Sequence, residues 1–209
     1  MTTPNAPLTL YYFPLSGHSH RAQLLLSLAR LPHELVNVDL ASGAHKRPEF
    51  LKKNPFGLVP VLEHGDFVIA ESNAILLYLA ETFASAAPYW PSDARSRAGV
   101  QRWLSVACGP LQRGPCLARV IRVFGRQFDH AEAVAVAQSL FGVMEQELAG
   151  RAFLVGGAPT LADLAMYTYT AHAPEGDVSL EPYPNIRSWV ARIQGLPHFV
   201  PMPSAPRRG

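Results

Sequence analysis

The chain has 209 residues, 48% of them hydrophobic and 16% charged, and its formal net charge is +2. This composition is typical of a globular protein with one or two domains and excludes an intrinsically disordered chain. The basic residues are scattered, whereas a nucleic-acid-binding protein carries them in a clustered patch. No apolar run reaches the roughly 18–20 residues that a membrane-spanning helix needs, and the start MTTPNAP is not typical of a signal peptide. We therefore expect a soluble, cytoplasmic protein that binds neither nucleic acid nor membranes.

Strand and helix patterns alternate over about the first eighty residues. One face of the first predicted helix is apolar and carries Ala22, Leu25, Leu26 and Ala29. Strands are predicted at 8–13, at 33–40 and in the hairpin VPVL-EHGD-FVIA, and further helices at 47–53 and 72–83. Parallel neighbours need a crossover connection and antiparallel neighbours a tight turn, so the order β-α-β-α-β-β-α predicts a mixed four-stranded sheet flanked by helices.

The stretch ASAAPYWPSD interrupts this pattern with two prolines, and no convincing strand follows it. Helices are predicted at 94–107, 130–149, 159–173 and 184–197. Thr160 and Asp163 form a variant of the capping box at the start of the third of these helices. We therefore expect a domain at 1–83, a linker at 84–92 and an all-helical domain at 93–209.

Glycine-proline pairs at 109–110 and 114–115 should kink or interrupt the helical pattern. They lie between the two cysteines, Cys108 and Cys116. Eight positions along a straight helix span about 12 Å, which is too far for a disulfide, but a bend would shorten that distance. The sequence disfavours a disulfide bridge here and leaves it open.

Pro60 begins the predicted hairpin, in FGLVPVLEHGDF. Proline cannot donate to a β-ladder, so it belongs at the first residue of a strand, at an edge or at a bulge. Two interpretations fit: a trans proline that ends a loop, or a cis bond that turns the backbone of Val59 towards a ligand.

Taken together, these features resemble the glutathione transferase superfamily, in its cytosolic, bacterial-type members, from about residue 8 to residue 201. NPFGLVPVL is similar to the element in which a cis-proline follows the residue whose backbone pairs with the cysteinyl part of glutathione. AESNAILLYLAE matches the acidic residue and the Ser or Thr that open a helix, and PTLADLAMY matches a capping box in the helical domain. The resemblance implies a thioredoxin-like domain followed by an all-α domain, a homodimer, glutathione as co-substrate and no metal.

The glutathione-binding residues follow from the resemblance. Val59 and Pro60, with a cis bond between them, would bind the peptide backbone of glutathione as an added strand. Glu71 would take the α-ammonium group and Ser72 the γ-glutamyl carboxylate, because a helix start favours an anion. Ser72 could also be an N-cap alone.

The glycyl end of glutathione would meet His45. The neighbouring Lys46 could do the same work, and His45 could instead be a solvated loop residue without a role in binding. Leu58 departs from the family, in which several members carry a Lys or Gln at that place. This departure is compatible with weaker binding of glutathione.

The loop YYFPLSGHSHRAQ should activate the thiol, because a free thiol has a pKa near 8.5 and a hydroxyl that donates to the sulfur favours the thiolate. Ser16 resembles the catalytic serine of the theta- and zeta-like classes and is our choice over Tyr12 and over the backbone or another side chain. Ser19 is expected to cap the following helix. The loop contains no cysteine, which disfavours a thiol reductase, and the histidine pair HSH is a weak signal for zinc.

The electrophile pocket implied by the resemblance would include Leu15, His18, Trp103, Cys108 and Arg113. For Trp103, packing in an ordinary helix core is the stronger interpretation. Nothing in the two halves identifies the electrophile. We predict a glutathione transferase that acts on a small hydrophobic electrophile. The alternatives are a glutathione-dependent cis–trans isomerase and a non-catalytic binding protein with the same fold.

Overall fold

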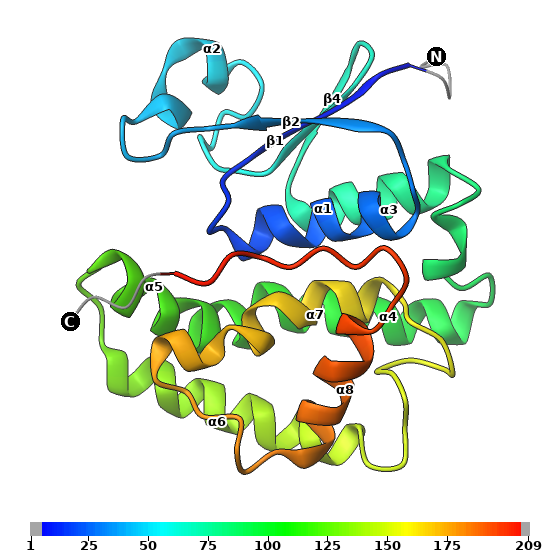
Figure 1. Ribbon diagram of the computed structural model, residues 1–209, viewed down its shortest axis with the longest axis vertical. Helices are drawn as coiled ribbons and strands as arrows, with labels where there is room; N and C mark the ends of the chain where they lie inside the picture. Colours follow the sequence, from blue (N-terminus) through cyan, green and yellow to red (C-terminus); the bar gives the residue numbers. More distant parts are fainter. Residues whose placement is uncertain (1–5, 206–209) are drawn as a thin grey trace. The chain divides into compact units, whose positions relative to one another are not determined.

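The computed structural model describes residues 6–205, and its internal contacts divide the chain into two compact units (Figure 1). The first unit extends to Trp90 and includes the segment Pro197–Met202. The second unit comprises Pro91–Leu196 and resumes at Pro203. Part of the stretch that we predicted as a linker, 84–92, is thus counted with the first unit and contains the 3-10 turn η2, Ala87–Tyr89.

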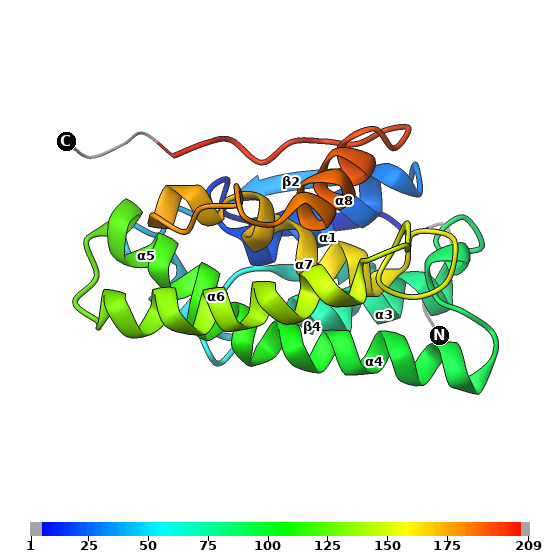
Figure 2. The ribbon, with the colours of Figure 1, turned by 90° about the horizontal axis from the view of Figure 1, so that it is seen from below.

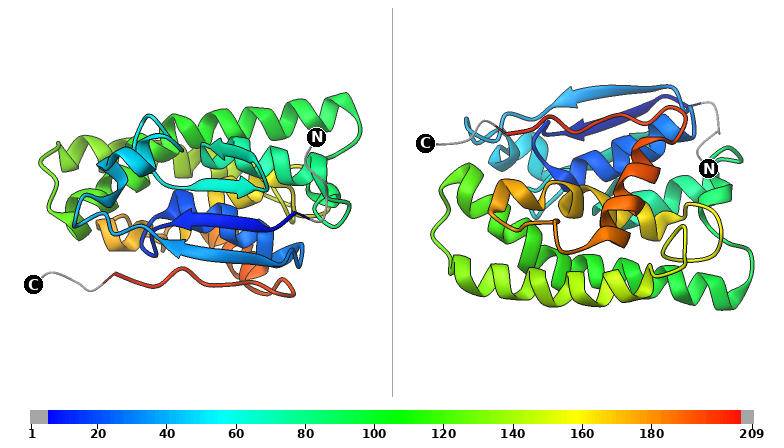
Figure 3. Two further views of the ribbon diagram at one scale, coloured as in Figure 1. Left: turned by 90° about the horizontal axis from the view of Figure 1, so that it is seen from above. Right: turned by 60° about the horizontal axis from the view of Figure 1, so that its bottom comes forward.

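A four-stranded sheet forms the centre of the first unit, in the order β2-β1-β3-β4 (Figure 3, left). Its strands are β1 (Leu8–Tyr12), β2 (His33–Asn37), β3 (Val61–His64) and β4 (Phe67–Ala70). β1 pairs with β2 in parallel and with β3 in antiparallel, and β4 is antiparallel to β3. The predicted mixed sheet is therefore confirmed.

Helices α1 and α3 lie side by side on one face of this sheet (Figure 1). The helical elements of the unit are α1 (Gly17–Leu28), the 3-10 turn η1 (Ala44–Lys46), α2 (Pro48–Leu51) and α3 (Ser72–Thr82). The face of α1 predicted to be apolar is buried, and so are Ile75, Leu76 and Leu79 of α3. Burial of these two faces against the sheet stabilises the unit through the hydrophobic effect.

The segment Pro197–Met202 packs on α1. Ser27 Oγ donates to the carbonyl oxygen of His198 at 2.7 Å, and His20 Nε2 lies 2.8 Å from the carbonyl oxygen of Val200. The ring of His20 also meets the ring of Phe199 edge-on. Residues from the end of the chain thus complete the first unit, which the sequence pattern did not indicate.

All regular elements in the described residues of the second unit are helices or helical turns, as predicted. Its elements are α4 (Ala94–Cys108), the π-helical turn η3 (Gln112–Cys116), α5 (Leu117–Phe124), α6 (His130–Glu147), α7 (Leu161–Ala171), the 3-10 turn η4 (Ala173–Gly176) and α8 (Pro184–Gln194). α4 and α6 run alongside each other in opposite directions (Figure 2). α7 is buried over nearly its whole length, as expected of a helix at the centre of a unit, and its buried residues include the polar Asp163, Thr168 and Thr170.

The glycine-proline pairs interrupt the helical pattern between α4 and α5, as predicted. α4 ends at Cys108, and the chain then forms the π-helical turn η3, which has Pro115 inside it. A Cβ atom on Gly114 would lie 2.7 Å from the backbone nitrogen of Ala137, so only glycine allows this turn to approach α6 so closely. Cys108 is exposed and Cys116 is buried, and no disulfide joins them.

The predicted capping box at the start of α7 is present, and Asp163 extends it. One carboxylate oxygen accepts from the backbone and side chain of Thr160, and the other accepts from Leu154 N and Trp189 Nε1. Burial raises the pKa of Asp163, and these four hydrogen bonds act in the opposite direction. Asp163 therefore joins three segments in the core, in line with the structural role predicted for it.

Candidate functional site

The register of the sheet brings four chain segments to one edge of the first unit. Tyr12 at the end of β1 pairs with Asn37 at the end of β2, and Tyr11 pairs with Val61 at the start of β3. Val61 in turn pairs with Ala70, the last residue of β4. The loops after β1 and β2, the loop before β3 and the start of α3 therefore all meet at this edge. Each of them carries one or more of the predicted glutathione-binding or catalytic residues.

Ser16 is the N-cap of α1, and its side-chain oxygen accepts a hydrogen bond from Ser19 N at 3.2 Å. A hydroxyl group that accepts in this way keeps its own proton to donate. The prediction that Ser19 caps the helix is wrong, because α1 begins earlier than the apolar pattern indicates. Ser19 instead turns back to accept from Phe13 N at 3.2 Å, which fixes the loop that carries Ser16.

The two tyrosines of β1 differ in their surroundings. The hydroxyl group of Tyr11 donates to Glu63 Oε2 at 2.8 Å, and Lys53, which pairs with Glu63, lies over the Tyr11 ring. Burial, and next the hydrogen bond to Glu63, raise the pKa of Tyr11. These contacts give Tyr11 a structural role. Tyr12, half-buried at the end of β1, stays the alternative activator of the thiol.

Leu15 and His18 flank Ser16 and are half-buried. Burial, together with the positive charge of Arg21, lowers the pKa of His18 to about 3. The His18 imidazole is therefore neutral at physiological pH. This part of the predicted electrophile pocket offers apolar and uncharged surface.

The peptide bond between Val59 and Pro60 is cis. Within the described part of the chain, no hydrogen bond involves the backbone N–H or C=O of Val59. Asn54 holds the loop that precedes it: Asn54 Nδ2 donates to the carbonyl oxygen of Leu58 at 2.8 Å, and Asn54 Oδ1 accepts from Phe56 N at 3.1 Å. Asn54 is 1% exposed and was missed as a site residue, although an asparagine before proline is a known turn signal.

The side chain of Lys46 is hydrogen-bonded to the same loop. Its ammonium group donates to the carbonyl oxygens of Phe56 and Gly57, at 3.1 and 3.0 Å. Gly57 has φ of +60°, and a Cβ atom there would lie 2.8 Å from the carbonyl oxygen of His45, so glycine is required on two counts. Two of the three Lys46 donors are therefore used inside the protein, and His45 lies half-buried beside it.

Glu71 stands at the N-cap position of α3 in a rare backbone conformation, with φ 71° and ψ 115°. Its exposed side chain forms no capping hydrogen bond, so the first N–H groups of α3 have no side-chain cap. Ser72 is therefore the first helical residue and not the N-cap, which was one of the two roles considered for it. Strained residues of this kind cluster at functional sites.

Arg21 of α1 was not predicted as part of the site, yet it reaches the start of α3. Its Nη1 atom donates to Ser72 Oγ at 3.3 Å and to Asn73 Oδ1 at 2.9 Å. Both Arg21 and Ser72 are buried. An arginine in a pattern of apolar helix residues was the only signal that could have drawn attention to it.

The remaining predicted pocket residues belong to the second unit. Trp103 and Arg113 line a cavity of about 360 Å³ on α4 and α6, whose other lining residues are largely apolar. Trp103 is 2% exposed, which agrees with a packing role in the helix core. Cys108 is exposed at the end of α4 and does not line this cavity.

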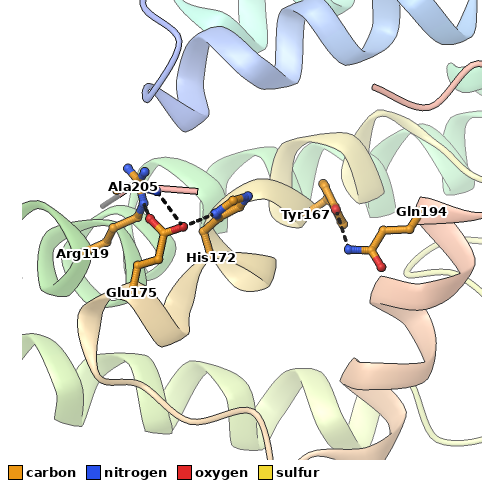
Figure 4. A network of polar contacts seen from close by, with 6 residues as sticks. All are labelled: Arg119, Tyr167, His172, Glu175, Gln194 and Ala205. Carbon is orange, nitrogen blue, oxygen red and sulfur yellow. Dashed lines mark hydrogen bonds and ion pairs between the residues drawn. The ribbon is translucent and has the colours of Figure 1, made fainter. Parts of the chain in front are cut away.

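A network of charged residues lies elsewhere in the second unit (Figure 4). The Glu175 carboxylate accepts from Arg119 Nε and meets His172 Nδ1, both at 2.7 Å, and the backbone N–H of Ala205 donates to it at 3.4 Å. Burial alone would raise the pKa of Glu175, but the hydrogen bond from His172 and the charge of Arg119 outweigh it and hold that pKa below its usual value. Arg119 is 1% exposed and Glu175 is half-buried, and their ion pair joins α5 to the chain after α7.

Residues 6–205 contain neither a cluster of metal-ligating side chains nor a membrane-spanning helix. No three His, Cys, Asp or Glu side chains come together in a way that could hold a metal ion. None of the helices in this range has the length and apolar character needed to cross a membrane.

Comparison with known proteins places the chain. Residues 6–81 match the family "Glutathione S-transferase, N-terminal domain", and residues 122–197 match "Glutathione S-transferase, C-terminal domain". Glutathione S-transferase 3 of Zea mays is 33% identical over 96% of this chain and 98% of its own length.

Two solved structures are similar in fold. A glutathione S-transferase from Pseudomonas fluorescens has a TM-score of 0.88 at 34% identity, covering 93% of this chain and 98% of its own. A glutathione transferase homolog from Drosophila mojavensis, solved with bound glutathione, has a TM-score of 0.83 at 26% identity, covering 92% and 89%. The chain therefore belongs to the glutathione transferase family.

Proposed function

We propose that the protein binds glutathione at the edge of its sheet, holds the thiolate form at Ser16 and directs the sulfur to a small hydrophobic electrophile. The observation that carries this proposal is the convergence of the predicted segments at one sheet edge. The bound glutathione of the Drosophila mojavensis homolog supports glutathione as the ligand.

Each part of glutathione has a partner in this proposal. The backbone of Val59 pairs with the cysteinyl part, because its N–H and C=O are unused within the described chain. Ser72 and the uncapped N–H groups of α3 bind the γ-glutamyl carboxylate, and Glu71 binds the α-ammonium group. His45 meets the glycyl end.

Ser16 supplies the chemistry. Its hydroxyl group donates to the sulfur, which favours loss of the thiol proton to solvent, and the positive end of α1 adds to the effect. The thiolate then attacks an electrophilic carbon and forms the new C–S bond. In a substitution the leaving group departs with its electron pair, and in a conjugate addition water protonates the resulting carbanion.

On the acceptor side, Leu15 and His18 of the first unit offer the surface against which the electrophile binds. The neutral state of His18 suits an uncharged electrophile. The proposal includes a homodimer in the cytoplasm. Phe56 and Leu58, with 73% and 54% of their surface exposed, offer apolar surface for a second copy to cover.

The test is to measure glutathione binding by calorimetry, the thiolate absorbance near 240 nm at neutral pH, and turnover of chlorodinitrobenzene. Binding with a thiolate signal and turnover supports the proposal. Retention of glutathione without a thiolate signal or turnover would favour the non-catalytic binding protein instead, for which the hydrophobic Leu58 is the motivating residue. Absence of binding would refute both.

A further inference from the structure

The guanidinium group of Arg21 connects α1 with the first turn of α3. It donates to Ser72 Oγ at 3.3 Å and to Asn73 Oδ1 at 2.9 Å. The residue is only 1% exposed, and charged side chains are almost never buried this far unless they are paired. Arg21 therefore sets a fixed positive charge beside the start of α3, with both of these acceptors neutral.

The hydrogen bond to Ser72 decides where the serine proton can point. A hydroxyl group has one proton to donate and two lone pairs that accept. The Arg21 guanidinium has only donors, so the Ser72 oxygen must accept from it and its own proton must point elsewhere. The uncapped N–H groups of α3 project from the same turn.

We propose that Arg21 is a positioning residue for glutathione: it orients the Ser72 hydroxyl towards the γ-glutamyl carboxylate and adds positive charge to the start of α3. This inference rests on the proposed function, in which Ser72 binds that carboxylate. Arg21 acts through Ser72 and Asn73, because its side chain is 1% exposed and donates to both of them.

Arg21 also links the two ends of the ligand site. It belongs to α1, which Ser16 caps, and it bonds to the first residues of α3, which Glu71 precedes. Its charge contributes, after burial, to the neutral state of His18. One buried cation thus fixes α1 relative to α3 within the first unit, and both helices present ligand-facing groups at their starts.

The test compares glutathione with γ-aminobutyryl-cysteinyl-glycine, which keeps the ammonium group and lacks only the γ-glutamyl carboxylate. The quantity measured is the ratio of the two dissociation constants, by calorimetry. Wild type should prefer glutathione, and Arg21→Met should lower that preference about tenfold, the size expected for one charge-assisted hydrogen bond. Ser72→Ala should lower it by a similar factor, and the double variant should lower it by less than the product of the two factors, because the two residues share one interaction while the charge of Arg21 also acts on its own.

A merely structural role would weaken both ligands equally and leave the ratio unchanged, which would overturn the proposal. Arg119→Met is the matched control, since Arg119 is equally buried but lies in the second unit. It should reduce stability and keep the ratio. If Arg21→Met does not fold, Arg21→Gln keeps an amide donor on a shorter side chain and removes the charge. It should lower the ratio at least threefold, because neutral hydrogen bonds are roughly half as strong.

The outcomes separate the two proposals. If wild type does not bind glutathione, the proposed function fails and this inference fails with it. If wild type binds and prefers glutathione while both Arg21 variants keep the full preference, only the role of Arg21 is refuted.

Discussion

Replacing Ser16 by alanine removes two interactions from the start of α1. The hydroxyl group proposed to donate to the glutathione sulfur is lost, and so is the oxygen that accepts from Ser19 N at 3.2 Å and caps the helix. The first loss should change the pKa of the bound thiol and the second the stability of the protein. The two effects can be measured separately.

The loss of the hydrogen bond to sulfur should change the pKa of the bound glutathione thiol. A hydrogen bond to a charged group is worth about 1.5–3 kcal/mol, and one pKa unit corresponds to about 1.4 kcal/mol. Ser16→Ala should therefore raise the pKa of bound glutathione by about one to two units. Ser16→Thr, which keeps a hydroxyl group, should retain most of the wild-type value.

The stability effect has a matched control in the second unit. Loss of a helix N-cap lowers the free energy of unfolding by about 1 kcal/mol, which lowers the melting temperature of a chain of this size by roughly 2–4 °C. Asp129 caps α6 by accepting from Glu132 N at 3.0 Å. Asp129→Ala should lower the melting temperature by a similar amount and leave the thiol pKa unchanged.

The assay is the absorbance of the thiolate near 240 nm as a function of pH, with glutathione at saturation for each variant. A thiolate that titrates at the wild-type pH in Ser16→Ala would refute the assigned role and transfer it to Tyr12 or to the backbone. A raised pKa in Asp129→Ala would show that the effect follows stability and not the hydroxyl group.

Three further predictions concern other features of the fold. Asp163→Asn places an amide NH₂ where an oxygen accepts two hydrogen bonds, so two buried donors lose their acceptor. At about 1–3 kcal/mol for each donor, the free energy of unfolding in urea should fall by about 2–6 kcal/mol. A fall of less than about 1 kcal/mol would contradict the account of this network. Glu71→Gly should relieve about 1–3 kcal/mol of backbone strain and therefore melt at a higher temperature than Glu71→Ala. Calorimetry should show that both variants bind glutathione more weakly than wild type. Equal melting temperatures of the two variants would argue against strain at this residue. Glu175 has a lowered pKa in the folded state, so it contributes stability above its unfolded pKa of about 4.3 that is lost as the pH falls. The melting temperature should therefore change less between about pH 3 and 6 in Glu175→Gln than in wild type. An equal dependence on pH in the two proteins would disprove the contribution.

The sheet could be predicted from the sequence because its topology depends on the order of elements and the lengths of their connections. A crossover helix between β1 and β2 requires a parallel pair, and the short turn between β3 and β4 requires an antiparallel one. The apolar face of α1 was predicted from its spacing for a similar reason, since a buried face repeats along the helix.

The site was harder to predict from the sequence because its details depend on contacts between residues that are far apart in the chain. Arg21 and Ser72 are 51 positions apart, and no local pattern indicates that they are bonded. The backbone of Glu71 adopts a conformation that side chains disfavour, so propensity argues against it there. Ser16 and Ser19 are both good caps, and the apolar spacing that locates a helix does not reach its first turn.

The segment Pro197–Met202 has a consequence for how such chains can be recombined. The chain leaves the first unit after Trp90 and contributes to it again after Leu196, so the first unit is not one continuous stretch. A chimaera of two relatives made with a single breakpoint between the units would keep Ser27 and His20 of one parent and supply the residues at 198 and 200 from the other. Exchange of the helical unit between family members therefore needs two breakpoints, so that the segment Pro197–Met202 comes from the same parent as the sheet.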